Sequence, residues 1–211
     1  MNPRAVGAWR RRIVVYYCCS MQTKSLNIPV EVSARHVHLT QEDWTALFGS
    51  AEMTIGRPIS QHPQFSAKER VTLRGPKGEL QGVAIVGPVR SYTQAELAMT
   101  DAKRLGVMPP LSDSGHLDQA VEVTIAGPKG EIKRAAAIIQ QRHLHVSPTE
   151  AADLHLHNGQ VVSMMIGTQR RVKFDQVLVR VHPKYSLRVH LDTDEANACG
   201  YTSDMIGEII V

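Results

Sequence analysis

Two histidine pairs in matched surroundings are the features of this sequence best suited to chemistry. Arg35-His36-Val37-His38 recurs 107 residues later as Arg142-His143-Leu144-His145, and each copy is followed by a hydroxyl residue and then an acidic one. Residues two apart on a β-strand face the same side. Each pair, placed on a strand, therefore aims two imidazoles at one point, as a first-row metal such as zinc requires.

The repeated context also indicates a third ligand in each half of the chain. The segment Leu97–Ala102 aligns with Leu191–Ala196, and the residues that precede the two segments are Glu96 and His190, both of metal-binding type. Three protein ligands with one open position are typical of catalytic zinc. The six predicted ligands are His36, His38 and Glu96 in one site and His143, His145 and His190 in the other.

The remaining histidines are expected to lie at the surface. His155 and His157 form a third pair, but a turn dipeptide follows it and the first half holds no counterpart. His62, His116 and His182 lie beside proline or in predicted loops. We therefore expect none of these five side chains to bind the metal.

Charge and composition exclude a nucleic-acid-binding surface. Hydrophobic residues make up 43% and charged residues 21% of the 211, as in ordinary globular proteins. The net charge of +4 comes from four arginines in residues 1–20, because the other 20 basic residues equal the 20 acidic ones. The rest of the chain has no basic excess to attract a polyanion.

Residues 1–20 are unlike the rest of the sequence. Three arginines precede a run of only seven apolar residues, Ile13–Cys19, whereas a bilayer span needs about 20. Three explanations stay open: a start site assigned upstream of the true one at Met21, a short targeting or encapsulation tail, and a membrane anchor. Only Cys199 lies outside this segment, so no disulfide framework is expected and the pattern favours a reducing cytoplasm.

The distribution of short strands predicts a mainly β fold. Residues 71–80 and 123–132 are nearly identical hairpin patterns around Gly-Pro-Lys-Gly, and several further strands end at Gly or Pro turns. Such patterns are typical of small barrels. We expect two small β-barrel domains from a duplicated half, residues 21–121 and 122–211, with strands free to interleave between the barrels.

A few short helices are expected beside the strands. Thr40 and Ser147 are helix caps directly after the histidine pairs, and Pro148 suits a first helical position. Residues 51–70 are interpreted as a loop and residues 107–118 as a linker between the halves.

Arg90 is the remaining candidate for chemistry. It lies in the turn Gly87–Ser91, six residues before Glu96, where its guanidinium could hold an anion such as phosphate. A solvated surface arginine is the open alternative. No nucleophile elbow, Walker motif or dinucleotide fingerprint is present, and Cys199 is expected to be packed rather than reactive.

Four segments resemble one family in order and spacing. They are residues 29–40, residues 87–96, residues 142–148 and residues 190–197. In these segments the sequence resembles the PduL-type phosphate acyltransferases, the phosphate propanoyltransferases of bacterial microcompartments. The resemblance covers the chain from about Ile28 onward.

The resemblance implies an enzyme that interconverts acyl-CoA and phosphate with acyl phosphate and CoA. The acyl-CoA that the resemblance implies is propanoyl-CoA, with acetyl-CoA as an alternative. The resemblance implies two β-barrels and two bound divalent metal ions, expected to be zinc. It assigns Arg90 to phosphate and Ser33, Arg57, His190 and Asn197 to coenzyme A.

The resemblance also implies a setting and partners. It places the enzyme in the cytoplasm or inside a microcompartment, where it would act in propanediol degradation beside shell or core proteins. It implies no nucleic-acid or membrane partner, and it leaves open whether the enzyme forms a homo-oligomer. Ala84 stands where the family has a basic residue. Two other functions stay open from the residues alone: a metal-dependent hydrolase that uses activated water, and a metal-binding module without catalysis.

Overall fold

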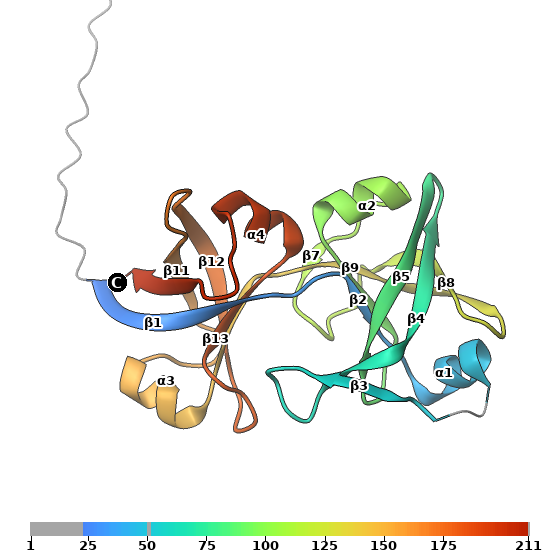
Figure 1. Ribbon diagram of the computed structural model, residues 1–211, viewed down its shortest axis with the longest axis horizontal. Helices are drawn as coiled ribbons and strands as arrows, with labels where there is room; N and C mark the ends of the chain where they lie inside the picture. The colour runs from blue at the N-terminus through green and yellow to red at the C-terminus, as the bar shows by residue number, and fades with distance from the viewer. Residues whose placement is uncertain (1–22, 50–51, 211) are drawn as a thin grey trace, which may run out of the picture.

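The computed structural model describes residues 23–49 and 52–210, which form two closed six-stranded barrels (Figure 1). The ring of the first barrel is β4 (Phe65–Gly75), β5 (Gly78–Gly87), β2 (His36–His38), β6 (Gln94–Leu97), β9 (Glu131–Gln140) and β8 (Val121–Ala126). The ring of the second is β11 (Val161–Ile166), β12 (Val172–Val181), β10 (His143–Val146), β13 (Arg188–Leu191), β1 (Thr23–Val32) and β14 (Ile206–Ile210). The predicted fold class is confirmed.

The two barrels have the same pattern of strand directions. In each ring the histidine-pair strand runs parallel to one neighbour, β5 or β12, and antiparallel to the other, β6 or β13. The strand β6 or β13 is in turn parallel to β9 or β1. This equivalence, strand by strand, is what a duplicated half produces.

The two halves of the chain exchange strands between the barrels. β1 lies in the second barrel although it directly precedes β2, and β9 lies in the first barrel although it directly precedes β10. β8 also belongs to the first barrel. The expected division at residues 121 and 122 therefore differs from the barrels themselves, because residues 121–140 close the first ring and residues 23–32 the second.

Four short helices follow the ligand-bearing strands. They are α1 (Gln41–Phe48), α2 (Met99–Leu105), α3 (Pro148–Leu154) and α4 (Thr193–Cys199). Thr40 and Ser147 cap α1 and α3 through their hydroxyl oxygens, as their sequences predict. Within the described residues, no helix is long and apolar enough to cross a membrane.

Two segments contain strands that the sequence reading did not expect. β3 (Ile55–Pro58) and the start of β4 lie within residues 51–70, so the interpretation of that segment as a loop was wrong. β7 (Leu111–Ser112) adds two residues beside β9 in the expected linker. The sequence did not predict β3 because all four of its residues are exposed. They therefore lack the alternation of buried and exposed positions that marks a half-buried strand.

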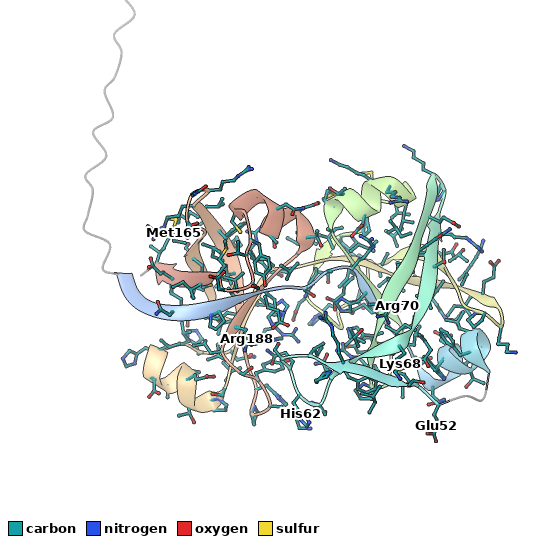
Figure 2. The ribbon with its side chains drawn as sticks, viewed as in Figure 1. Glu52, His62, Lys68, Arg70, Met165 and Arg188 are labelled. Atoms are coloured by element: carbon teal, nitrogen blue, oxygen red, sulfur yellow. The ribbon has the colours of Figure 1, made fainter. Side chains whose placement is uncertain are left out.

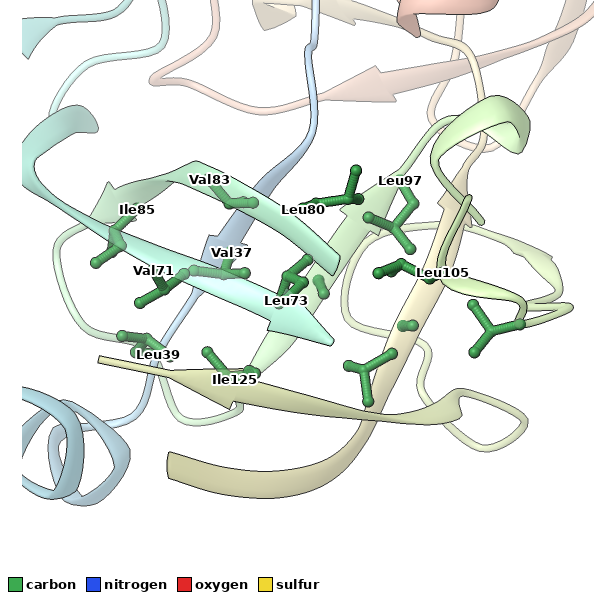
Figure 3. Close-up of a cluster of buried hydrophobic side chains, with 14 of the residues drawn as sticks. Val37, Leu39, Val71, Leu73, Leu80, Val83, Ile85, Leu97, Leu105 and Ile125 are labelled. Atoms are coloured by element: carbon green, nitrogen blue, oxygen red, sulfur yellow. The ribbon is translucent and has the colours of Figure 1, made fainter. Parts of the chain in front are cut away.

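Every second residue of a ring strand points into its barrel, and these residues form the two barrel cores. Val37 and Leu144, the middle residues of the two histidine pairs, are fully buried in the first and second core. Figure 3 shows Val37, Leu73 and Ile125, from three different strands, in the first cluster. Because neighbouring residues of a strand face opposite sides, the histidines must point out of the barrels.

The two Gly-Pro-Lys-Gly turns each cap the end of a helix. The backbone N–H of Lys77 donates to the carbonyl of Leu105 at the end of α2, and that of Lys129 donates to the carbonyl of Leu47 near the end of α1, both at 3.0 Å. The helix carbonyls therefore lie against the turns. A Cβ at Gly127 would lie 2.6 Å from the Leu47 oxygen.

Replacing Gly127 with alanine should destabilise the first barrel, because the added methyl group meets a backbone atom that cannot rotate away. We expect the free energy of unfolding in urea to fall by about 1–3 kcal/mol. Gly130→Ala is the matched control, since its Cβ would lie 3.3 Å from the nearest atom, the Ala46 oxygen. Equal losses in the two variants would contradict the steric explanation.

Candidate active site

The first predicted triad comes together on two neighbouring strands. His36 on β2 is paired in register with Glu96 on β6, and His38 lies two residues further along β2. The Nε2 atoms of the two histidines are 3.2 Å apart and lie 3.5 and 3.7 Å from the carboxylate oxygens of Glu96. All three side chains are buried.

The second triad is built by the same register. His143 on β10 is paired with His190 on β13, and His145 lies two residues further along β10. The ring centroids of these histidines are between 4.5 and 5.0 Å apart. In both triads the candidate ligand atoms lie within 4.8 Å of one another.

Backbone carbonyls orient three of the imidazoles. Nδ1 of His36 lies 2.9 Å from the carbonyl of Ala34, Nδ1 of His38 lies 2.9 Å from that of Val86, and Nδ1 of His143 lies 2.9 Å from that of Gln141. A carbonyl only accepts, so each Nδ1 carries the proton. In the neutral ring Nε2 then presents its lone pair to the other ligands.

The donor atoms of both triads fit a bound cation. In the first triad two Nε2 lone pairs face each other at 3.2 Å, close to the spacing of about 3.3 Å between tetrahedral nitrogen ligands of zinc. In the second, both ring nitrogens of His145 and Nε2 of His190 are buried without a hydrogen-bond partner. A cation between the rings satisfies atoms that are otherwise costly to bury.

Burial also holds the ligands in the protonation state that a metal needs. Burial lowers the pKa of His38 to about 4, that of His143 to about 3 and that of His190 to about 4, and it lowers the pKa of His145 as well. Burial alone raises the pKa of Glu96, but the neighbouring His36 and His38 outweigh it and hold that pKa well below its usual range. At neutral pH these four imidazoles are therefore neutral and Glu96 is a carboxylate, as metal ligands must be.

Gln94 fixes the carboxylate of the first triad. Its side chain is fully buried two residues before Glu96, and its amide nitrogen donates to Oε1 of Glu96 at 2.6 Å. The same nitrogen donates to the hydroxyl of Ser114, and the amide oxygen accepts from the backbone N–H of Gly115. A rigid carboxylate follows, because every polar atom of the Gln94 side chain is engaged.

The arginine that precedes each histidine pair has a structural partner. Arg35 forms an ion pair with Asp101 of α2 at 3.0 Å, and Arg142 forms one with Glu195 of α4. Each acid lies in the helix that follows the third ligand of the same triad. The repeated arginines thus tie each histidine strand to the element that carries its third ligand.

Both triads face one cavity between the barrels. The cavity measures about 360 Å³, and the six predicted ligands and Arg90 line it. Figure 2 labels Arg188 on β13 of the second barrel, and Nε of this residue lies 3.8 Å from a carboxylate oxygen of Glu31, which lines the cavity. The sequence predicted one site per half, and the structure brings the two sites to one space.

Arg90 is held in the cavity wall by polar partners from three segments. Its guanidinium donates to the hydroxyl of Tyr92 at 3.1 Å, to the hydroxyl of Ser114 at 3.4 Å and to the side-chain oxygen of Gln64 at 3.1 Å. No carboxylate is among these three partners. The guanidinium charge is therefore available to an anion in the cavity.

The residues expected on the coenzyme A side divide into two groups. Ser33, Arg57 and His190 line the cavity, as does Ala84, the position where a basic residue was expected. Asn197 is exposed on α4 and does not line it.

Sequence reasoning missed several polar residues of the cavity. Glu31, Arg180 and Tyr185 line it, and Tyr185 stacks on His145 with ring centroids 3.9 Å apart. Nε2 of His190 lies 3.9 Å from a carboxylate oxygen of Glu31. Arg180 could have been found, because it interrupts an otherwise apolar run, Val177–Val181.

The surface histidines lie where the sequence places them. His155 and His157 are exposed after α3, and His62, His116 and His182 are exposed in loops. Cys199 is buried, burial raises the pKa of its thiol, and the thiol donates to the carbonyl of Ala196. Its predicted packing role is confirmed. Cys18 and Cys19 lie outside the described residues.

Comparisons with known proteins agree on one family. A model of the phosphate propanoyltransferase family matches residues 29–202. The chain is 42% identical over 191 residues to the phosphate propanoyltransferase of Alkaliphilus metalliredigens, with 90% of each chain covered. It is 45% identical over 201 residues to that of Priestia megaterium, with 94% of this chain and 92% of the relative covered. The relative from Thermotoga maritima is 44% identical over 178 residues, with 83% of this chain and 85% of the relative covered.

The lowered histidine pKa values predict how the metal-free protein responds to acid. Four buried histidines bind protons near pH 6.5 when unfolded but near or below pH 4 when folded, so stability present above pH 6.5 is lost as the pH falls toward 4. Each contributes up to about 1.4 kcal/mol per pH unit in this window. Burial raises the pKa of Asp192 to about 6, which acts in the opposite direction, but this is one group against four.

Urea unfolding of the chelator-treated protein at pH 7 and pH 5 measures this effect. We expect clearly lower stability at pH 5, and a weaker dependence in His143→Asn, which removes one of the four titrating rings. A free energy of unfolding that is the same at both pH values would show that the histidines are not held neutral by burial.

Proposed function

The chain belongs to the phosphate propanoyltransferase family, and on that basis we propose that it transfers acyl groups between coenzyme A and phosphate in a metal-dependent reaction. Phosphate acyltransferase activity follows from the family. The observation that supports metal dependence is the pair of buried triads facing one cavity together with Arg90. Propanoyl-CoA is the proposed substrate, with acetyl-CoA as a smaller alternative.

Two divalent ions, with zinc preferred, are proposed for the triads. His36, His38 and Glu96 would hold one ion, and His143, His145 and His190 the other. Imidazole and carboxylate ligands in sets of three suit zinc and leave a position open. A bound ion in such a site acts as a Lewis acid toward a carbonyl or phosphoryl oxygen and is a favourable partner for a thiolate.

Arg90 is proposed to bind the phosphate. A guanidinium offers a planar pair of N–H donors that match phosphate oxygens. Tyr92, Ser114 and Gln64 hold the group through neutral contacts, so it is oriented but not neutralised. These contacts support the binding of a second, anionic substrate next to the triads.

The coenzyme A side is proposed to comprise Ser33, Arg57, His190 and Asn197. Arg57 is exposed on β3 at the edge of the cavity, where a phosphate group of coenzyme A can reach it from solvent. Asn197 is exposed on α4 outside the cavity, so its role requires the cofactor to extend beyond the cavity rim. Since Ala84 offers no charge, Arg57 is the cation of this group.

The proposed reaction is direct attack without an acyl-enzyme. An oxygen of hydrogen phosphate attacks the thioester carbonyl, the carbon–sulfur bond breaks, and the proton of the phosphate passes to the departing sulfur, giving acyl phosphate and coenzyme A. Within the described residues Cys199 is the only cysteine, and it is buried in a barrel core away from the cavity. The chain's own contribution is to orient phosphate through Arg90 beside the buried side chains of the triads.

Metal content should fall to about one equivalent per chain in His190→Ala, because one ligand of the second triad is lost while the first triad is intact. We expect about two equivalents in the wild-type protein after dialysis. His157→Ala is the control, since this histidine is exposed and outside both triads. Elemental analysis that finds the wild-type metal content in His190→Ala would overturn the ligand assignment.

Arg90→Ala should reduce phosphate-dependent release of coenzyme A from propanoyl-CoA by about 100- to 1000-fold, because one preorganised electrostatic partner of the reacting anion is lost. A colorimetric thiol assay measures this, and an unchanged melting temperature shows that the variant is folded. Retention of more than about a tenth of wild-type turnover at saturating phosphate would reject the role. In the wild-type protein, release that is independent of phosphate would instead indicate a hydrolase, and no release a binding module.

A further inference from the structure

Arg180 is a charged residue of the cavity that belongs to neither triad. It lies on β12, where it is paired in parallel register with His145 of β10. Its side chain is 24% exposed and lines the same cavity as Arg90. A positive charge at this depth needs an anionic partner within reach.

The barrel architecture does not require an arginine at this position. The two barrels are equivalent strand by strand, and β5 of the first barrel corresponds to β12 of the second. The pairs Val37–Ile85 and Leu144–Val179 are equivalent, so the residue that corresponds to Arg180 is Val86. Val86 is an apolar residue with 9% exposure. The first barrel is therefore closed with a valine at this position. The arginine at the equivalent position of the second barrel is not needed to close the ring and has another role.

One loop connects Arg180 to Arg90. NH1 of Arg180 lies 3.4 Å from a carboxylate oxygen of Asp113, and NH1 of Arg90 lies 3.4 Å from the hydroxyl of the next residue, Ser114. Consecutive Cα atoms are about 3.8 Å apart. Two guanidinium groups, one from each barrel, therefore contact consecutive residues of one loop, and Ser114 of this loop lines the cavity together with both arginines.

The charges that line the cavity favour a small anion. Two glutamates line it, Glu31 and Glu96. Four arginines line it as well, and these are Arg35, Arg57, Arg90 and Arg180. Arg35 is already paired with Asp101. Arg180 has Asp113 at 3.4 Å, a partner whose side chain is 23% exposed, so water screens this ion pair and an incoming dianion can replace it.

We propose that Arg180 is a second phosphate-binding residue, which holds from the second barrel the phosphate that accepts the acyl group, while Arg90 holds that phosphate from the first. The inference rests on the proposed transfer to phosphate. Asp113 is the counter-ion of Arg180 when the cavity holds no phosphate. A tetrahedral phosphate has oxygens enough for two guanidinium groups and for ligands on the side of the triads.

The test is the Michaelis constant for phosphate in the full-length, metal-bound protein. Arg180→Met should raise the KM for phosphate by about 10- to 100-fold, the loss expected for a charge-assisted hydrogen bond. Arg180→Lys should lie between Arg180→Met and the wild-type enzyme, because an ammonium keeps the charge but loses the planar pair of donors. The KM for propanoyl-CoA and the metal content should stay within about twofold of wild type.

A second variant separates phosphate binding from a structural role of the ion pair. Asp113→Asn keeps an acceptor for the backbone N–H of Ser114 but removes the charge that competes for Arg180. It should lower the KM for phosphate by about two- to fivefold, the range of a partly exposed ion pair. If Arg180 and Asp113 only tie the barrels together, both variants should instead lower the melting temperature together and leave the KM for phosphate unchanged.

Phosphate stabilisation gives a readout that does not depend on turnover. Inorganic phosphate should raise the melting temperature of the wild-type protein and of the control Arg171→Met, a surface arginine paired with Glu208. It should raise the melting temperature of Arg180→Met by less.

A KM for phosphate within twofold of wild type in Arg180→Met, or a rise confined to the KM for propanoyl-CoA, would overturn the proposal. If wild type and Arg171→Met release coenzyme A without phosphate, the proposed function fails instead, whatever Arg180 does.

Discussion

The mutual repulsion of closely held nitrogen lone pairs is the constraint on which the centre of this molecule depends. His36 and His38 direct unprotonated Nε2 atoms at each other because a carbonyl accepts the proton of each Nδ1. Burial keeps the pKa of His38 near 4, so this ring is neutral at neutral pH and its Nε2 keeps a lone pair. Such an arrangement is favourable only around a cation. The strand register, the backbone acceptors and Gln94 all serve to maintain it.

The exchange of strands places the two triads in one space. A histidine pair that points out of its barrel would face solvent if each half folded by itself. Because β1 and β9 cross between the barrels, the strands that follow them, β2 and β10, begin where the two barrels meet. Ion pairs formed by Arg35 and Arg142 hold the chain at these crossings against α2 and α4. The same crossings therefore connect the barrels and bring the ligands together.

Much of the candidate site could be predicted from the sequence, because the duplicated halves show the same pattern of ligand residues twice. The matched histidine pairs and the shared Leu97 and Leu191 contexts identified Glu96 and His190, which the strand register places opposite His36 and His143. The division into halves could not be read this way, because an exchanged strand has the same local pattern as a retained one. Arg180 and Tyr185 were missed for a related reason: they occur in only one half, so comparison of the halves gives no signal for them.

The crossing strands also bear on how such a chain arose. With the crossing kept as it is here, a polypeptide of half this length, with one strand before the histidine pair and the rest after it, would leave one place of its own ring open. It would lend its first strand to a second copy and accept that copy's strand in return, as in a domain-swapped homodimer. Its cavity would then lie on the twofold axis with two identical triads. Fusion of the two genes would preserve this intertwined arrangement and release its symmetry, which is the condition under which Glu96 and His190, or Val86 and Arg180, can differ at equivalent positions.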